Sequence, residues 1–269
     1  MEMIYQYTSL EVLALILHNR KIRFRNLCSM DDPLEKYVKK LDLDPKDKHL
    51  KFVRSDFGKF CFISCWTYAE EELISMWDMY GDRKNGVRIG LPIDMFDSTF
   101  NINASRENNV KPLFELKKEQ YVQPEFIEVD YSRLDDPKLV VNDWKIEIGN
   151  LGKYKTRDWA FQKECRFRLY AAETSENKEQ WFVPVENKSF VGLVSYKPSS
   201  LSYVDFPMNN NAYNNIQIVV GPNMNYGKRV MLNGLIDEYN LDRERVFESR
   251  FKLDFEGLRF ELDEDRSKS

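Results

Sequence analysis

One stretch of the chain, residues 60–91, limits the possible folds more than any other part of the sequence. It starts with a nearly continuous apolar run at residues 60–65, which is typical of a buried strand. A helical pattern follows at about residues 70–80, then a polar turn at residues 82–86 and a second strand-like run at residues 87–91. A strand, a helix and a strand in such short order predict mixed α+β packing.

Further elements fit the same fold class. A short strand at residues 4–7 precedes a helix for which Ser9 is the expected N-cap, and residues 21–24 alternate basic and apolar side chains. Strand-like runs recur later, at residues 126–131, 164–171, 181–185, 216–220 and 245–250. Helices are expected at about residues 139–151 and 227–239.

These elements predict one domain over residues 1–262. The chain is polar and weakly patterned at about residues 101–150, which we interpret as an insertion into that domain. Residues 263–269 are expected to form a solvated tail. A chain of 269 residues is long enough to bury a sizeable core.

Composition narrows the classes of partner and location. A formal charge of -4 gives no global attraction to nucleic acid or to an anionic membrane. No run approaches the roughly 20 apolar residues that span a bilayer, and the start lacks a signal-like pattern, so we expect a cytoplasmic protein without a membrane partner. The four cysteines are expected to be packed free thiols, and because no Cys or His spacing completes a zinc site, no metal is expected.

Aromatic and hydrogen-bonding side chains gather in three short parts of the sequence that lie far apart. They are residues 5–10, residues 64–66 with the following residues 75–80, and residues 159–166. If the fold brings them together, they would line a cleft with flat rings, hydroxyls, one carboxylate and one guanidinium. Such a cleft suits a small molecule that carries a ribose or a base.

Each candidate residue also has a simpler structural interpretation. Trp77 and Tyr80 share one face of the expected helix, where they could stack on a planar ligand or pack as an aromatic pair in the core. Glu164 and Arg166 share one face of a strand, either in a polar cleft or as an exposed ion pair worth about 0–1 kcal/mol. The hydroxyls of residues 7–9 could equally cap the first helix.

Several catalytic arrangements lack support in this sequence. Asp31, Asp32 and Glu35 form an acidic cluster that favours helix capping, with a metal or general-base role as the alternative. With only two histidines, His18 and His49, the sequence gives little support to a mechanism centred on histidine. The chain contains no Rossmann glycine motif, no P-loop and no nucleophile elbow.

The spaced motifs resemble those of a bacterial family, the domain-of-unknown-function 2971 family. The resemblance runs from residue 5 to about residue 168. It is carried by Tyr-x-Tyr-Thr-Ser-Leu, Asp-Asp-Pro-Leu-Glu, Cys-Phe-Ile-Ser, Met-Trp-x-x-Tyr, Gly-Val-x-Ile-Gly and Trp-x-x-x-x-Glu-x-Arg. Two positions depart from the family pattern, because Asp31 stands where Asn is usual and Gln162 where Glu is frequent.

More distantly, the layout looks like the ADP-ribosyltransferase superfamily. That resemblance implies a central, largely antiparallel split sheet flanked by helices, and NAD as co-substrate. It also implies roles for residues of this chain: Tyr7 and Thr8 as the early hydrogen-bonding element, Tyr80 as the nicotinamide-stacking ring with Trp77 beside it, and Glu164 as the catalytic carboxylate. Arg166 would hold Glu164 in place or meet a phosphate.

The function expected from this resemblance is NAD-using transfer or hydrolysis, in a toxin or effector of bacterial phage defence. The acceptor of a transferred group, a protein or a nucleic acid, is not specified by the sequence. One alternative is a non-enzymatic module that binds a nucleotide or a protein. Another is an RNA-binding or RNA-cleaving protein, for which the basic runs at residues 20–23 and 117–118 are the only support.

Overall fold

The computed structural model shows a mixed α+β fold around one main sheet. It describes residues 2–30, 35, 57–100, 110–112, 123–131, 141–142, 145–146, 151–173, 181–184, 190–194 and 201–252. The strands are β1 Met3–Thr8, β2 Lys21–Asn26, β3 Cys61–Thr67, β4 Val87–Pro92, β5 Val110–Pro112, β6 Glu125–Glu128, β7 Val141–Asn142, β8 Lys145–Ile146, β9 Glu164–Glu173, β10 Trp181–Pro184, β11 Phe190–Val194, β12 Tyr203–Pro207, β13 Gln217–Val220 and β14 Val246–Glu248. The helices are α1 Leu10–Asn19, α2 Ile74–Met79, α3 Asn210–Asn214 and α4 Tyr226–Glu238.

The main sheet has ten strands and is mostly antiparallel, which confirms the expected fold class. Seven strands follow the order β12-β2-β3-β1-β4-β13-β14, and β9 adds to β3 and carries β5 and β6. β13 and β14 pair in parallel, whereas the other pairs in this sheet are antiparallel. Two short two-stranded sheets, β10-β11 and β7-β8, complete the described strands.

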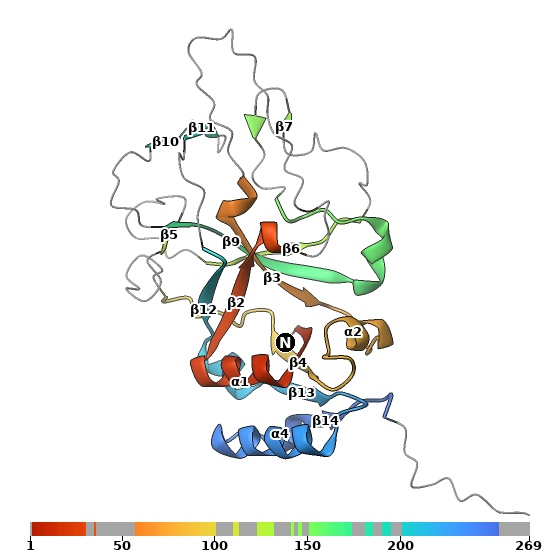
Figure 1. The fold of residues 1–269 in the computed structure, drawn as a ribbon. Helices are drawn as coiled ribbons and strands as arrows, with labels where there is room; N and C mark the ends of the chain where they lie inside the picture. The colour runs from red at the N-terminus through yellow and green to blue at the C-terminus, as the bar shows by residue number, and fades with distance from the viewer. Residues whose placement is uncertain are drawn as a thin grey trace, which may run out of the picture.

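The sheet has one apolar face, which forms the core. On β2, Ile22 and Phe24 are buried on this face, whereas Arg23 and Arg25 point the other way and are exposed. This alternation follows from the two-residue period of a strand and confirms the strand expected at residues 21–24. Side chains of α1 and α4 pack against the apolar face, and Figure 1 shows the two helices together at one end of the ribbon.

Local sequence explains why α1 forms where it does. The Ser9 side chain accepts a hydrogen bond from the backbone N–H of Val12, as expected for an N-cap. Arg20 closes the helix in the left-handed conformation, with φ of 51°. Leu13 and Leu17, four residues apart, are both fully buried against the sheet.

The second face of the sheet carries polar and aromatic side chains. The sheet splits between β1 and β2, which both pair with β3. β2 pairs with the start of β3, where Arg25 lies opposite Ile63. β1 pairs with the end of β3, where Tyr5 lies opposite Thr67. Because β1 and β2 meet β3 at different points along its length, a fork opens between them.

Two expected helices differ from the structure. The helix expected at residues 70–80 is shorter, since α2 begins at Ile74. Within the segment expected to be a helix at residues 139–151, the described residues contain β7 and β8 instead. The β-branched Val141 and Ile146 lie opposite each other in this antiparallel pair, an arrangement that such side chains favour over a helix.

The expected domain bounds stay a prediction. Within the segment interpreted as an insertion, β6 joins the main sheet by pairing with β9. The expected tail at residues 263–269 and Asp31 and Asp32 lie outside the described residues. No helix within the described residues is long and apolar enough to cross a membrane.

Candidate functional site

A cleft of about 210 Å³ lies at the fork between β1 and β2. All three of the aromatic and polar sequence segments contribute to its walls. They supply Tyr5, Gln6 and Tyr7, then Ser64, Cys65, Trp66, Met76 and Tyr80, and then Trp159, Gln162, Glu164 and Arg166. The structure thus places in one cleft residues that are up to 161 positions apart, from position 5 to position 166.

Glu164 lies at the floor of the cleft as the first residue of β9. Its side chain is only 6% exposed, and both carboxylate oxygens have cationic partners. Arg166 Nε donates to Oε1 at 2.7 Å, and Lys155 Nζ donates to Oε2 at 2.9 Å. The two-residue period of β9 places Cys165 and Phe167 in the core, which confirms the predicted division of the faces.

The Glu164–Arg166 pair is buried, so the interpretation as an exposed surface pair is wrong. Arg166 is fully buried and donates through Nη1 to the carbonyl of Gly152 at 2.7 Å. A cation at such depth has to be paired to remain charged without a large free-energy penalty. Glu164 therefore contributes to the folding of this region as well as to the cleft.

A second carboxylate, that of Glu35, meets the same cations. Arg166 Nη2 donates to Glu35 Oε1 at 2.9 Å, and Lys155 Nζ lies 3.5 Å from the same oxygen. The Glu35 side chain is 2% exposed, and its other oxygen, Oε2, is buried and has no hydrogen-bond partner among the described residues. The role expected for Glu35 as part of a helix cap needs correction, because its carboxylate reaches the cleft and pairs with Arg166.

The charges in this cluster fix the protonation of its members. Burial on its own would raise the pKa of Glu164, but the nearby charges of Arg166 and Lys155 outweigh it and lower the pKa to about 2. Burial likewise acts to lower the pKa of Lys155, but attraction to Glu164 and Glu35 raises it above its usual value. Glu164 is therefore a permanent anion near neutral pH and does not exchange protons there as a general acid or base.

A chain of hydrogen bonds links the aromatic wall to this cluster. Lys155 Nζ donates to Gln162 Oε1 at 2.8 Å, and Gln162 Nε2 donates to the Tyr80 hydroxyl at 3.0 Å. Gln162 ends a 3-10 helix, and Lys163, at φ of 44°, turns the chain into β9. The position where the family pattern frequently has Glu thus holds an amide that connects Tyr80 to Lys155.

The other aromatic residues of the cleft are held by neighbouring groups. The Trp159 ring lies 4.7 Å from Lys155 Nζ, within the range of a cation–π contact. The Tyr5 ring stacks on the guanidinium of Arg88 at 3.7 Å. The Tyr7 hydroxyl accepts a hydrogen bond from the backbone N–H of Leu73 at 3.0 Å.

Two of the predicted ligand-binding residues lie elsewhere. Trp77 is 0% exposed, packs edge-on against Tyr7 and donates its indole N–H to Glu72 at 2.8 Å. Its ring is enclosed by protein on all sides and cannot stack on a ligand in the cleft, so the core interpretation replaces the binding one. Thr8 contributes to a neighbouring hollow, while Tyr7, Tyr80, Glu164 and Arg166 line the cleft as predicted.

The neighbouring hollow measures about 270 Å³ and adjoins the cleft. It lies between β2 and α1. The hollow and the cleft share the lining residues Gln6, Tyr7, Arg23 and Arg25. Sequence reasoning noted the basic and apolar alternation of β2 but connected Arg23 only with the RNA-binding alternative and gave Arg25 no role in a site. It also missed Lys155, because nothing in its sequence surroundings distinguishes it from a surface lysine.

Among the described residues, no group of three or more His, Cys, Asp or Glu side chains could hold a metal ion. Burial raises the pKa of Cys65, the thiol in the cleft, which keeps it protonated and unreactive. The chemistry of the cleft therefore depends on its rings, carboxylates and cations.

Comparison with known proteins gives one match. A family model described as "Protein of unknown function (DUF2971)" matches residues 76–167, which include Tyr80, Gln162, Glu164 and Arg166. No curated protein and no solved structure matches the chain. The comparisons thus support the resemblance to the domain-of-unknown-function 2971 family. They give no support to the resemblance to the ADP-ribosyltransferase superfamily. Over residues 76–167, the chain is similar to a family of proteins of unknown function.

Proposed function

We propose that this cleft binds NAD and cleaves its bond between nicotinamide and ribose, for transfer of ADP-ribose to a macromolecule or to water. The observation that carries the proposal is the placement of a buried, ionised carboxylate, Glu164, beside the Tyr80 and Trp159 rings of one cleft. A planar nicotinamide would lie against the rings, with its ribose toward the carboxylates.

The charge cluster suits such a reaction. Departure of nicotinamide leaves positive charge on the ribose, as in the oxocarbenium-like transition states of glycoside hydrolysis. Glu164 is held ionised and in a fixed position by Arg166 and Lys155, so its negative charge needs no reorganisation during the reaction. Glu164 would act as a fixed charge rather than as a proton carrier.

The size of the cleft indicates how much of the ligand it would hold. A volume of about 210 Å³ is smaller than the ~300–1,000 Å³ of most small-molecule sites. We infer that the cleft takes the nicotinamide ring and its ribose. The rest of the dinucleotide would extend past Arg23 and Arg25 toward the adjoining hollow.

The test is nicotinamide release from NAD, measured by chromatography with the purified protein. Glu164→Gln keeps the shape of the side chain and removes its charge, and we expect a loss of activity of about 10²-fold or more. Glu71→Gln changes an exposed carboxylate outside the cleft, and we expect it to keep full activity. Cell extract is added to one arm as a source of acceptors. Absence of release in both arms would contradict the proposal.

A non-enzymatic nucleotide-binding module is the second candidate. It is favoured by one observation, that both oxygens of Glu164 are already occupied by Arg166 and Lys155, as in a structural ion pair. This candidate predicts NAD binding without nicotinamide release. The basic run at residues 20–23 adds little to the RNA alternative, since Arg20 stacks on Tyr213 and Arg23 pairs with Asp205.

A further inference from the structure

Two charged groups of the cleft have no partner among the described residues. One is Glu35 Oε2, the buried carboxylate oxygen, and the other is the guanidinium of Arg25 on β2. The other cations at the cleft floor, Lys155 and Arg166, are fully engaged. These two groups therefore show what a ligand would have to supply.

Glu35 Oε2 calls for a hydrogen-bond donor. Buried polar atoms in folded proteins nearly always have a partner, and a buried carboxylate oxygen without one is costly. Arg166 and Lys155 both lie against the other oxygen, Oε1, which leaves Oε2 free to accept. Glu35 lines the cleft, so a donor bound there would meet Oε2 once the buried carboxylate shifts toward it.

Arg25 is placed to bind an anion. It is exposed and lies between Ile63 of β3 and Tyr203 of β12 in the sheet. Arg23, two residues earlier on the same face, is paired with Asp205 and stacked on the Tyr203 ring at 3.7 Å. Arg25 has no such acidic partner in the described part of the chain, and it lines both the cleft and the adjoining hollow.

We propose that Arg25 and Glu35 recognise a ribose 5-phosphate unit, with Arg25 binding the phosphate and Glu35 Oε2 accepting from a ribose hydroxyl. A guanidinium can donate two parallel hydrogen bonds to a phosphate. A carboxylate oxygen is a strong hydrogen-bond acceptor for a hydroxyl. A ligand without an anionic group would leave Arg25 unpaired. A ligand that offered a carboxylate in place of the hydroxyl would be repelled by the negative charge of Glu35.

This inference rests on the proposed function only for the identity of the base. It assigns ligand-binding roles to two residues, one of which, Glu35, the sequence indicated as a helix cap. It also gives a role to Arg25, which lines the cleft from the basic face of β2, since the phosphate would lie there. The ring would then lie against the aromatic wall that includes Tyr80.

The experiment is calorimetric titration with two probes that differ only in the 5′-phosphate, nicotinamide mononucleotide and nicotinamide riboside. Wild-type protein is expected to bind the mononucleotide about tenfold or more tightly than the riboside, because a charge-assisted contact is added. Arg25→Gln is expected to remove that difference and leave riboside affinity unchanged. Glu35→Gln is expected to weaken both probes to a similar extent.

The controls separate recognition from folding. Arg243→Gln removes an exposed arginine outside the cleft and should bind both probes like wild type. Arg25→Lys keeps the charge and should retain part of the phosphate preference. Binding of the mononucleotide should weaken with added salt in the wild type and much less in Arg25→Gln, a readout that a purely structural role would not move.

Several outcomes would overturn the inference. They are equal affinity of the wild type for the two probes, no binding of the mononucleotide at millimolar concentration, or unchanged preference in a folded Arg25→Gln. Unchanged affinity for both probes in Glu35→Gln would overturn the assignment of the hydroxyl. Binding that depends on Arg25 without any cleavage of NAD would sustain this inference and defeat the proposed enzymatic function.

Discussion

At the scale of single residues, the cleft is built on charges that are needed for folding as well as for binding. Glu164, Arg166, Lys155 and Glu35 balance one another, with all four side chains 8% exposed or less. Removing one member leaves the buried charges unbalanced, which costs more than the lost ion pair itself contributes. Substitutions here have to be measured for stability and for binding separately.

The depressed pKa of Glu164 leads to a prediction about stability and pH. Its usual value is 4.5 and its value in the folded protein is about 2, so the folded state favours the anion. The stabilisation is complete above about pH 4.5 and is lost as the pH falls from there toward 2. We expect Glu164→Gln to lower the free energy of unfolding at pH 7 by about 3–5 kcal/mol, because it removes one of the two carboxylates that balance Arg166 and Lys155.

Urea denaturation at a series of pH values measures this effect. The difference in the free energy of unfolding between wild type and Glu164→Gln should shrink as the pH falls below about 4.5. A difference that stays constant from pH 7 down to pH 3 would contradict the ion-pair explanation. Glu71→Gln is the matched control, because the Glu71 carboxylate is 80% exposed.

At the scale of secondary-structure elements, the period of each strand divides the core from the site. β2 alternates between the apolar face with Phe24 and the cleft face with Arg25, and β9 does the same with Phe167 and Arg166. The sequence predicted this division, because the two-residue period of a strand is a local property. It can be recognised without knowing which strands lie next to it. It could not show which of the outward-facing side chains meet.

Neighbouring residues of β2 should therefore respond to substitution in opposite ways. Phe24→Ala empties a fully buried position against Phe96 and Phe206, and we expect a loss of about 3–5 kcal/mol in the free energy of unfolding. Arg25→Ala changes an exposed side chain and should stay within about 0.5 kcal/mol of wild type. Urea denaturation of the two variants decides the matter, and similar losses in both would contradict the assigned faces.

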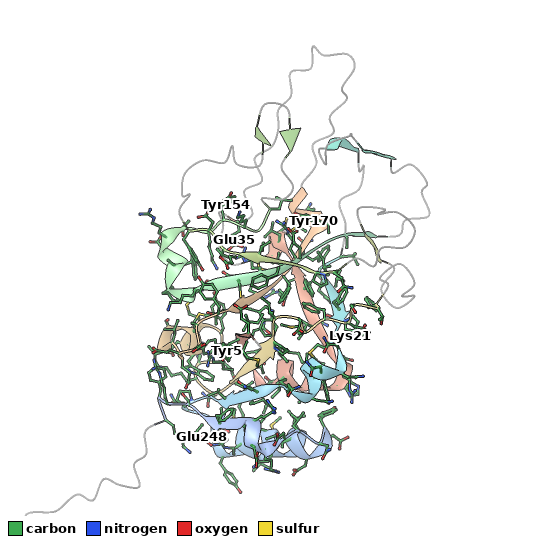
Figure 2. The ribbon with its side chains drawn as sticks, turned by 180° about the vertical axis from the view of Figure 1, so that it is seen from behind. Tyr5, Lys21, Glu35, Tyr154, Tyr170 and Glu248 are labelled. Carbon is green, nitrogen blue, oxygen red and sulfur yellow. The ribbon has the colours of Figure 1, made fainter. Side chains whose placement is uncertain are left out.

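At the scale of the whole molecule, one buried carboxylate joins distant parts of the chain. Glu72, just before α2, accepts hydrogen bonds from the Trp77 indole, the Ser249 hydroxyl at 2.6 Å and the backbone N–H of Arg250 at 2.9 Å. Ser249 directly follows β14, which is an end strand in the order of the main sheet. Figure 2 labels Glu248 at one end of the described molecule and Glu35 near the other, so this contact lies far from the Glu35 side of the cleft.

We expect Glu72→Ala to destabilise this end of the molecule while leaving the cleft able to bind. The substitution leaves the indole N–H of Trp77 and the hydroxyl of Ser249 without their acceptor, which should cost about 1–3 kcal/mol. Hydrogen exchange should show reduced protection at residues 246–252, with protection of β9 unchanged. Equal loss of protection in β9 would contradict the separation of the two regions.

The sequence by itself determined the fold class, the strands that bear the site and the face of β9 on which Glu164 and Arg166 lie. Those properties follow from local periodicity and from turn and cap residues, which act over a few positions. Only the tertiary structure decided that Trp77 is core, that Glu35 and Lys155 join Glu164, and that Arg25 has no partner among the described residues. Burial and ion pairing depend on which segments the sheet brings side by side, and local sequence does not encode that juxtaposition.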